Sequence, residues 1–354
     1  MNFAIGVDLG GTNLRIAAVG EKGELLEKVT TGTRLALGRD AVIGEMVTAI
    51  GELVRKHSGA HRLLGVGIGV PGIIDKRTGM LRQSPNLPGW DDYPVRDEIE
   101  RRLGAPVVLE NDANCAALGE AWLGVARHAE NMCMITLGTG VGGGIVLNGR
   151  IWQGMTGMAG EVGHIIVFPD GPQCGCGSHG CVEQFASATA IVRMAREAIA
   201  GGHAPALTKA SVEGDAEFSA KVVYSLAMQG DKAAREIFRK VGQALGLLLA
   251  DVINALNLEM YVIGGGVSNA WDAFAPAMFE ELLRRSFVYA ATAPEDVCAA
   301  IAEGASAAVR PLESGPRTVI TRALLGSDAG LFGAARLPVD SPRRHGATEE
   351  PIIE

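Results

Sequence analysis

The chain begins with F-A-I-G-V-D-L-G-G-T-N-L-R-I-A-A-V at residues 3–19. Two apolar runs, Phe3–Val7 and Leu14–Val19, flank the turn Gly10-Gly11-Thr12, and a third run follows at Glu24–Thr30. Apolar runs separated by short glycine-rich turns are typical of neighbouring antiparallel strands. The opening residues therefore predict a β-meander that starts with a glycine hairpin.

The same pattern returns in N-M-C-M-I-T-L-G-T-G-V-G-G-G-I-V-L-N-G at residues 131–149. We predict a strand over Asn131–Leu137, a turn over Gly138–Gly144 and a returning strand over Ile145–Leu147, followed by an Asn148-Gly149 hairpin turn. Two copies this far apart indicate two similar half-molecules, because the repeats of solenoid proteins are much shorter.

Strands and helices alternate through the rest of the chain, which indicates the α/β class. Further strands are expected at Leu63–Val70, Pro106–Leu109 and Met260–Ile263. Apolar spacing predicts helices at Asp40–His57, Val95–Leu103, Ala113–Leu123, Ala188–Ala200, Ala216–Met228, Asp231–Asn257, Ala273–Arg285 and Ala329–Ala335. The charged, proline-containing tail at 340–354 is predicted to be disordered.

Composition limits the classes of protein to consider. A chain of 354 residues with 47% hydrophobic content can bury a large core and form two domains. Its net charge of −8 gives no broad attraction to nucleic acid, and no apolar run reaches membrane-spanning length. Cys115, Cys133 and Cys298 stand alone in apolar settings and are predicted to be buried small hydrophobes.

The glycine turns are candidate phosphate-binding loops. A glycine turn can present unobstructed backbone N–H groups to a polyphosphate, and its residues often adopt positive φ. Thr12 and Thr139 add hydroxyl donors, and Asp8 can hold a phosphate-bound Mg²⁺. A third glycine turn stands at Gly264–Gly266. The alternative is that these turns serve only the fold.

The spacing Gly138-x-Gly140-x-x-Gly143 also matches a dinucleotide-binding fingerprint, with Glu161 as the ribose acid. That fingerprint has to open a helix. Here a strand is predicted instead, so the sequence argues against a dinucleotide enzyme.

Residues 161–183 read E-V-G-H-I-I-V-F-P-D-G-P-Q-C-G-C-G-S-H-G-C-V-E. A set of one histidine and three cysteines suits tetrahedral Zn²⁺, and its members here are His164, Cys174, Cys176 and Cys181. The alternative is thiols that bind nothing. Clustered thiols of this kind indicate metal rather than disulfides, and hence a reducing cytoplasm.

Several polar residues around this cluster suit a polyhydroxylated ligand. His164 can bind zinc through one ring nitrogen and donate a hydrogen bond to the ligand through the other. Acceptors and donors are available from Glu161, Glu183, Asn86 and Asn111. The zinc would then order the site without taking part in the reaction.

Asp112 follows Asn111 where a predicted strand meets a predicted helix. It can cap that helix by accepting backbone N–H bonds. It can equally act as a general base, because the carboxyl ends of strands line ligand sites in α/β folds. Phosphoryl transfer needs such a base for the attacking hydroxyl, together with alignment and charge neutralisation.

The chain resembles the ROK family (repressors, open reading frames and sugar kinases) from Phe3 to about Leu337. The resemblance is carried by Asp8-Leu-Gly-Gly-Thr12, Glu110-Asn-Asp-Ala-Asn114, Leu137-Gly-Thr-Gly140, Glu161-x-x-His164 and Cys174-x-Cys176-x4-Cys181-x-Glu183. It implies an actin-like ATPase fold of the α/β class, with two RNase H-like domains flanking a central cleft. The smaller domain would comprise residues 1–114 and 326–339, and the larger one 115–325. Residues Gly326–Ala335 resemble the closing helix of the family, which packs back on the N-terminal domain.

The resemblance also implies an activity and a homodimer. The chain is most similar to the family's bacterial glucokinases, which use Mg-ATP to phosphorylate the 6-hydroxyl of glucose in glycolysis. Kinases of N-acetylmannosamine, N-acetylglucosamine, fructose or allose remain alternatives, as does a non-catalytic sugar sensor. The family's repressors carry an N-terminal helix-turn-helix module, whereas this sequence starts directly at its first strand, which argues against a DNA-binding regulator. Some members carry lysine where Asn13 stands here.

The resemblance assigns roles residue by residue. Asp112 would be the general base. Sugar would be bound by Asn86, Asn111, Asp112, Glu161, His164 and Glu183. ATP would be bound by Asp8, Gly10, Gly11, Thr12, Gly138, Thr139, Gly140, Gly264, Gly265 and Gly266. Structural zinc would be held by His164, Cys174, Cys176 and Cys181.

Overall fold

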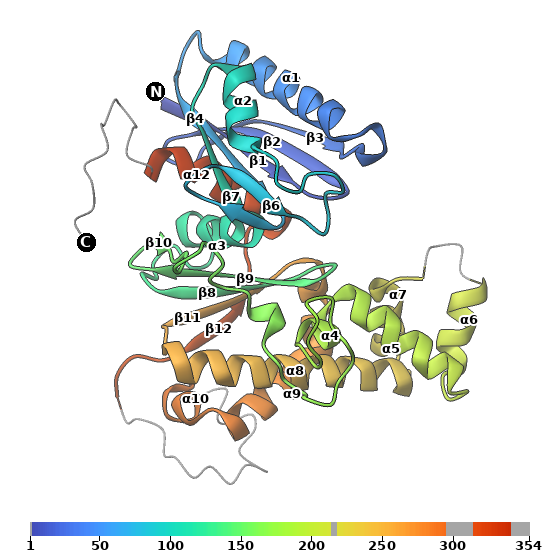
Figure 1. The fold of residues 1–354 in the computed structure, drawn as a ribbon. Coiled ribbons are helices and arrows are strands. Elements are labelled where there is room, and N and C mark those ends of the chain that lie inside the picture. Colours follow the sequence, from blue (N-terminus) through green and yellow to red (C-terminus); the bar gives the residue numbers. More distant parts are fainter. Residues whose placement is uncertain (1, 214–217, 295–313, 341–354) are drawn as a thin grey trace. The chain divides into compact units, whose positions relative to one another are not determined.

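The computed structural model describes residues 2–213, 218–294 and 314–340, which form two compact units (Figure 1). The first unit contains the chain up to Asp112 and again from Gly330, and the second runs from Ala113 to Ala329. Cys298 and the predicted tail at 341–354 lie outside the described residues.

The first unit is built on a five-stranded sheet in the order β3-β2-β1-β4-β7. β1 (Asn2–Leu9), β2 (Asn13–Gly20) and β3 (Leu25–Gly32) form the predicted antiparallel meander. β4 (Arg62–Val70) and β7 (Val107–Asn111) run parallel to β1. A small pair that the sequence did not predict, β5 (Ile73–Asp75) and β6 (Met80–Gln83), follows β4.

Helices cover both faces of this sheet (Figure 1). α1 (Arg39–His57) and α2 (Val95–Leu103) bury their apolar residues in one core with β1, β2, β4 and β7. α12 (Ala329–Asp340) packs against Gly6 and Gly67, where a Cβ would overlap the carbonyl oxygens of Leu331 and Ala334. The predicted tail began at residue 340, but α12 continues through Pro338 to Asp340. The proline ring packs beside Gly65 and Gly67, which accommodates it.

The second unit repeats the strand order of the first, as β10-β9-β8-β11-β12. β9 (Val141–Leu147) pairs antiparallel with both β8 (Met132–Leu137) and β10 (Arg150–Ile151). β11 (Met260–Gly264) runs parallel to β8 and β12 (Val319–Arg322). The repeat in the sequence therefore corresponds to a repeated sheet topology.

The predicted turn over Gly138–Gly144 was too long, because Val141–Gly144 is already paired with β8. The reason lies in α3 (Asp112–Trp122), which covers this face of the sheet. A Cβ at Gly142 or Gly144 would crowd the methyl groups of Ala113 or Ala117. These glycines thus serve a close approach between helix and sheet rather than a turn.

The other face of the second sheet carries a larger helical layer. α8 (Lys232–Leu256) is its longest helix, capped by the Asp231 side chain at its N-terminus and by Asn257 in the left-handed conformation at its C-terminus. Around it lie α4 (Glu183–Ala186), α5 (Ala188–Ala200), α7 (Ala220–Met228), α9 (Trp271–Arg285) and α10 (Phe287–Thr292), and α6 (Pro205–Glu213) packs on α5 and α7. Short 3₁₀ turns complete the two units. The first unit contains η1 (Leu35–Leu37), and the second contains η2 (Val162–His164), η3 (Gly266–Ala270) and η4 (Gly326–Asp328). Within the described ranges, no helix combines the length and apolarity needed to cross a membrane.

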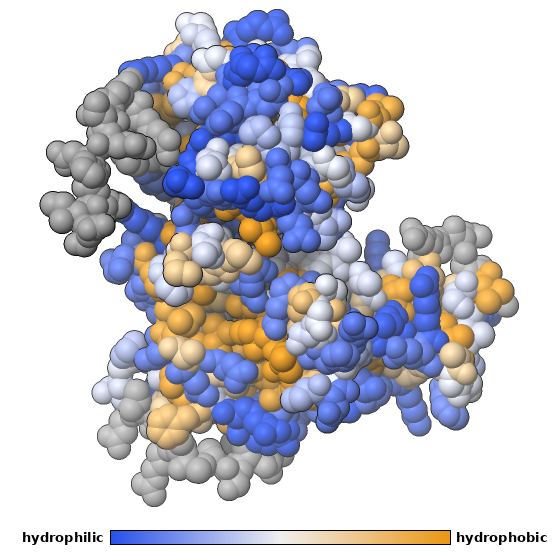
Figure 2. Space-filling model, viewed as in Figure 1, coloured by the Kyte–Doolittle hydropathy of each residue, from blue (hydrophilic) through white to orange (hydrophobic). Residues whose placement is uncertain are grey.

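Apolar residues gather on one face of the second unit, where Figure 1 places β11 and the adjoining end of α8 (Figure 2). That end of α8 also lines a cavity of about 360 Å³, together with Ile145 and residues 160–162 and 165. Most of its lining is apolar, with Glu161 and Asp251 as its charged members.

Candidate functional site

The first glycine turn joins β1 to β2. The Gly10 N–H donates to the Asn13 carbonyl at 2.9 Å, and the Thr33 hydroxyl donates to the Gly10 carbonyl at 2.7 Å. Neither Gly10 nor Gly11 has φ in the left-handed range, so the expected positive φ is wrong here. Glycine is instead suited to a close approach, because a Cβ on Gly11 would lie 3.2 Å from the carbonyl oxygen of Asn86. The exposed Asn86 thus lies beside this turn.

Asp8 stands at the end of β1, next to the first glycine turn. Its carboxylate pairs with the Arg15 guanidinium at 2.8 Å. These two residues face each other in the β1–β2 register, so the hairpin itself could have revealed the pair in the sequence. Gly330, at the start of α12, also borders the Asp8 carboxyl group. Its partly exposed carboxylate and the neighbouring turn suit a phosphate-bound cation.

Asn111 and Asp112 occupy the junction of β7 and α3, as predicted. The side-chain amide of Asn111 donates to the Gly72 carbonyl at 3.3 Å. The preceding residue, Glu110, has a buried carboxylate that accepts the Asn111 N–H at 2.9 Å. Lys76 lies 2.5 Å from that carboxylate and also donates to the Leu109 carbonyl at 2.8 Å. This ion pair holds the end of β7, and sequence reasoning missed it.

We predict that Lys76→Met destabilises the protein by about 3 kcal/mol, because it leaves the buried Glu110 carboxylate without its cation. The measurement is the free energy of unfolding in urea, compared between wild type and variant. Lys22→Met is the control, since Lys22 is an exposed residue of a turn. An unchanged unfolding midpoint in Lys76→Met would contradict this role of the ion pair.

The second and third glycine turns lie against each other in the second unit. Gly138–Gly140 is fixed by a hydrogen bond from Ala188 N–H to the Gly138 carbonyl at 2.8 Å and by one from the Thr189 hydroxyl to the Thr139 carbonyl at 2.8 Å. Gly138 and Gly140 also lack positive φ, whereas Gly265 has φ of +82°. A Cβ at Gly265 would overlap the backbone of Leu137, immediately before the second turn.

A strand, β9, follows the second turn. The dinucleotide fingerprint requires a helix at that point, so the structure confirms that the Gly138–Gly143 spacing is not such a fingerprint.

Glu183 links the second turn to the cysteine cluster. One carboxylate oxygen accepts the Val141 N–H at 2.9 Å, and the other lies 4.0 Å from the Cys174 sulfur. A Cβ at Gly140 would overlap this carboxylate. Only glycine at position 140 therefore leaves room for the Glu183 side chain in its present position.

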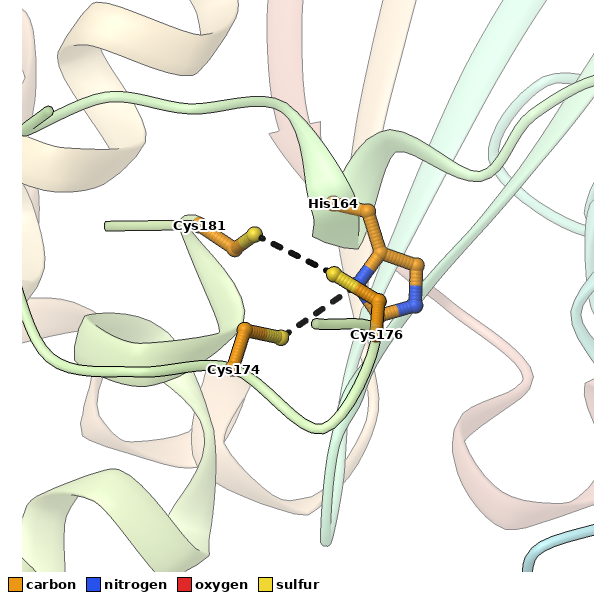
Figure 3. A group of neighbouring side chains, drawn as sticks. All are labelled: His164, Cys174, Cys176 and Cys181. Carbon is orange, nitrogen blue, oxygen red and sulfur yellow. Dashed lines mark hydrogen bonds between the residues drawn. The ribbon is translucent and has the colours of Figure 1, made fainter. Parts of the chain in front are cut away.

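The four predicted metal ligands come together (Figure 3). Their ligand atoms all lie within 4.8 Å of one another. The Cys176 and Cys181 sulfurs are 3.7 Å apart, and the Cys174 sulfur is 3.6 Å from Nδ1 of His164. Two thiolates bound to one tetrahedral Zn²⁺ at about 2.3 Å would be separated by about 3.8 Å. The set therefore has the composition and spacing of a zinc site.

His164 presents its two ring nitrogens to different groups. Nδ1 faces the cysteine sulfurs (Figure 3). Nε2 points to the carboxylate of Glu161 at 4.0 Å, and both side chains are partly exposed. The short turn η2 supports this arrangement, since the His164 N–H donates to the Glu161 carbonyl at 3.1 Å. The His164 side chain is thus oriented as predicted, with one ring nitrogen available to a metal and the other to a ligand.

The cysteine environments differ. A hydrogen bond from the Ser178 backbone lowers the pKa of Cys176, whereas burial raises the pKa of Cys181 to about 12. Burial likewise raises the pKa of Cys133 to about 12, and Cys115 and Cys133 are fully buried, as predicted. Because zinc binds thiolates, a zinc ion taken up by these residues would release protons, and the affinity for it would rise with pH.

The candidate residues fall into two groups by unit. Asp8, the first glycine turn, Asn86, Asn111 and Asp112 belong to the first unit. The second and third glycine turns, Glu161, Glu183 and the cluster of His164 with the three cysteines belong to the second. Each group contains a candidate phosphate turn and candidate sugar residues.

The family model described as the ROK family matches residues 4–312. The chain belongs to the ROK family. A glucokinase from Thermotoga maritima is 40% identical over 279 residues, which cover 79% of this chain and 86% of that protein. A glucokinase from Streptomyces coelicolor is 34% identical over 344 residues, covering 95% of this chain and 98% of that one.

Solved ROK structures share the fold. A ROK family glucokinase from Streptomyces griseus, determined in complex with glucose and AMPPNP, superimposes with a TM-score of 0.71 at 34% identity, over 95% of this chain and 99% of that one. Together with the repeated strand order, this confirms the expected α/β, actin-like ATPase fold.

Proposed function

We propose that this ROK protein is an ATP-dependent glucokinase that transfers the γ-phosphoryl group of ATP to the 6-hydroxyl of glucose. The observation that carries the proposal is identity of 40% and 34% to two bacterial glucokinases, the second over nearly the whole chain. The sequence contains Asp112 and the two candidate phosphate turns, Gly10–Thr12 and Gly138–Gly140. Their presence favours a kinase over a non-catalytic sensor.

The proposed reaction uses Asp112 as the base. Its carboxylate takes the proton of the glucose 6-hydroxyl while the sugar oxygen forms a bond to the γ-phosphorus. The bond between that phosphorus and the β–γ bridging oxygen breaks, and the electron pair leaves with ADP. Backbone N–H groups of the two glycine turns stabilise the phosphate charge. Mg²⁺, bound with ATP near Asp8, would neutralise further charge on the phosphates.

The proposed sugar-binding residues all carry hydrogen-bonding side chains. Asn86 and Asn111 can donate and accept, whereas Glu161 and Glu183 accept from sugar hydroxyls. His164 would donate from Nε2 to the sugar, while its Nδ1 would bind zinc. The zinc held by His164, Cys174, Cys176 and Cys181 would be structural, because its four protein ligands complete a tetrahedral set. Its function would be to keep the His164 and Glu161 side chains in place.

A homodimer and a location in the cytoplasm are part of the same proposal. Family resemblance supports the dimer, and a cluster of thiols suited to zinc supports a reducing compartment. Size-exclusion chromatography with light scattering tests the dimer directly, and a mass of one chain would contradict it.

The product tests the proposed chemistry. After incubation with glucose and Mg-ATP, ³¹P–¹H correlation spectroscopy should connect the new phosphate to the two protons on carbon 6. Correlation to the proton on carbon 1 would assign phosphorylation to the wrong hydroxyl and reject the proposal. Formation of ADP without any phosphorylated sugar would reject it as well.

We predict that Gly140→Ala raises the KM for glucose by about tenfold, since the new methyl group displaces the Glu183 carboxylate. Gly138→Ala is the matched control in the same turn, because a Cβ there meets no atom within 4 Å. Gly138→Ala should keep the wild-type KM for glucose. Equal KM values for glucose in the two variants would contradict the role given to Glu183.

A further inference from the structure

Glu120 is a fully buried carboxylate that has no part in the chemistry described above. It lies on α3, two turns after Asp112, and none of its surface is exposed. A buried charge is costly unless hydrogen bonds satisfy it. Its contacts therefore indicate what holds it there.

Three backbone N–H groups donate to this carboxylate. One oxygen accepts from Val125 at 2.9 Å and from Leu324 at 3.1 Å, and the other accepts from Leu325 at 2.7 Å. Val125 follows the end of α3. Leu324 and Leu325 come some 200 residues later, between β12 and α12. Glu120 thus fastens two distant segments of the second unit to each other.

Two glycines complete the contact. A Cβ at Gly119 would overlap the carbonyl oxygen of Ala329, the first residue of α12. A Cβ at Gly124 would overlap the Glu120 carboxylate itself. We call Glu120, with the three N–H groups and these two glycines, the α3 clasp.

The segments joined by the α3 clasp are the ones that carry the chain between the two units. The chain passes from the first unit to the second at Asp112–Ala113 and returns at Ala329–Gly330. Asp112 is the first residue of α3, and Gly330 borders the carboxyl group of Asp8. The clasp is therefore connected through α3 to the proposed base, Asp112. Through the start of α12 it is connected to Asp8, the proposed neighbour of the ATP-bound Mg²⁺.

We propose that Glu120 is a positioning residue of the kinase reaction. Glu120 joins the two segments at which the chain passes between the units, next to Asp112–Ala113 and Ala329–Gly330, into one rigid element. This element holds the carboxylate of Asp112 at the correct place for proton transfer. The inference rests on the proposed function of Asp112. Small displacements matter in such a step, since a misplacement of about 1 Å can cost about 100-fold in rate.

Glu120→Gln tests the proposal with little change in shape. The amide retains one acceptor oxygen, but its NH₂ group must then face a backbone N–H donor. We expect kcat to fall by about 10- to 100-fold while the KM for glucose stays within about threefold of wild type, because Asn86, Glu161 and Glu183 are untouched. Glu281→Gln is the matched control. Glu281 is also a buried glutamate of the second unit, but its carboxylate pairs with Arg284 and Arg285 on its own helix.

Hydrogen exchange reports on the clasp independently of activity. In Glu120→Gln, amide exchange should become faster in residues 323–329 and around Val125, whereas Glu281→Gln should leave both regions unchanged. Wild-type kcat in a folded Glu120→Gln variant would overturn the proposal, as would equal loss of kcat in the two variants. If wild-type protein phosphorylates no sugar, the proposed function fails, whereas unchanged exchange at 323–329 would reject the clasp itself.

Discussion

Replacing Asp112 by alanine is expected to lower kcat by about 100- to 10,000-fold, the usual contribution of a general base. The reason is that the variant has no carboxylate at the start of α3 to accept the proton of the sugar hydroxyl. Sugar binding should remain measurable, because Asn86, Asn111, Glu161 and Glu183 are unchanged. The measurements are kcat from steady-state kinetics and glucose affinity from isothermal titration calorimetry.

The control separates catalysis from helix capping. Asp272 is the acidic residue in the first turn of α9, as Asp112 is in that of α3. Asp272→Ala should therefore cost a similar amount of helix stability and leave kcat unchanged. If Asp112→Ala keeps ordinary turnover, or if its loss of kcat equals that of Asp272→Ala, Asp112 is a structural residue and not the base.

Loss of the metal cluster is expected to weaken sugar affinity before anything else. Cys176→Ser removes the most exposed of the three cysteine ligands and so disturbs the core least. In the proposed site the ion fixes His164 and the adjoining Glu161, so its loss would free both side chains. Each hydrogen bond to a charged group contributes about 1.5–3 kcal/mol, and tenfold in affinity corresponds to about 1.4 kcal/mol. We therefore expect the KM for glucose to rise by about 10- to 100-fold.

The same variant should keep its affinity for Mg-ATP, because Ala188 and Thr189 still hold the second glycine turn. Metal content is measured by inductively coupled plasma mass spectrometry, with one zinc per chain expected in wild type. Cys133→Ala is the control, a buried cysteine of the same unit that lies outside the cluster. A folded, zinc-free variant with wild-type affinity for glucose would refute the link between metal and sugar.

Local patterns in the sequence predicted much of the fold. The glycine hairpin of Phe3–Val19 and its repeat near residue 131 gave the duplicated sheet, because strand alternation and turn residues are local signals. The Asn148-Gly149 turn has positive φ at both residues, as the pair predicts. The His164 and cysteine positions converge as their spacing indicated.

The errors arose where the partner of a residue is distant in the sequence. The roles of Gly142 and Gly144 depend on α3, and the helical conformation at Pro338 depends on Gly65 and Gly67. Lys76–Glu110 and the clasp of Glu120 with Leu324 and Leu325 join segments that no local pattern connects. One signal in the sequence could have indicated both contacts. Glu110 and Glu120 are glutamates within otherwise apolar elements, and a buried glutamate needs a partner.

A coupled ADP-release assay across a panel of hexoses and amino sugars tests the central claim most directly. With Mg-ATP, we expect glucose to give the highest kcat/KM, above N-acetylmannosamine, N-acetylglucosamine, fructose and allose. In Asp112→Ala we expect the rate of ADP release with glucose to fall by about 100-fold or more. A higher kcat/KM with one of the other sugars would assign the protein to a different ROK kinase activity. No sugar-dependent ADP release from folded, zinc-loaded protein would contradict the assignment as a kinase.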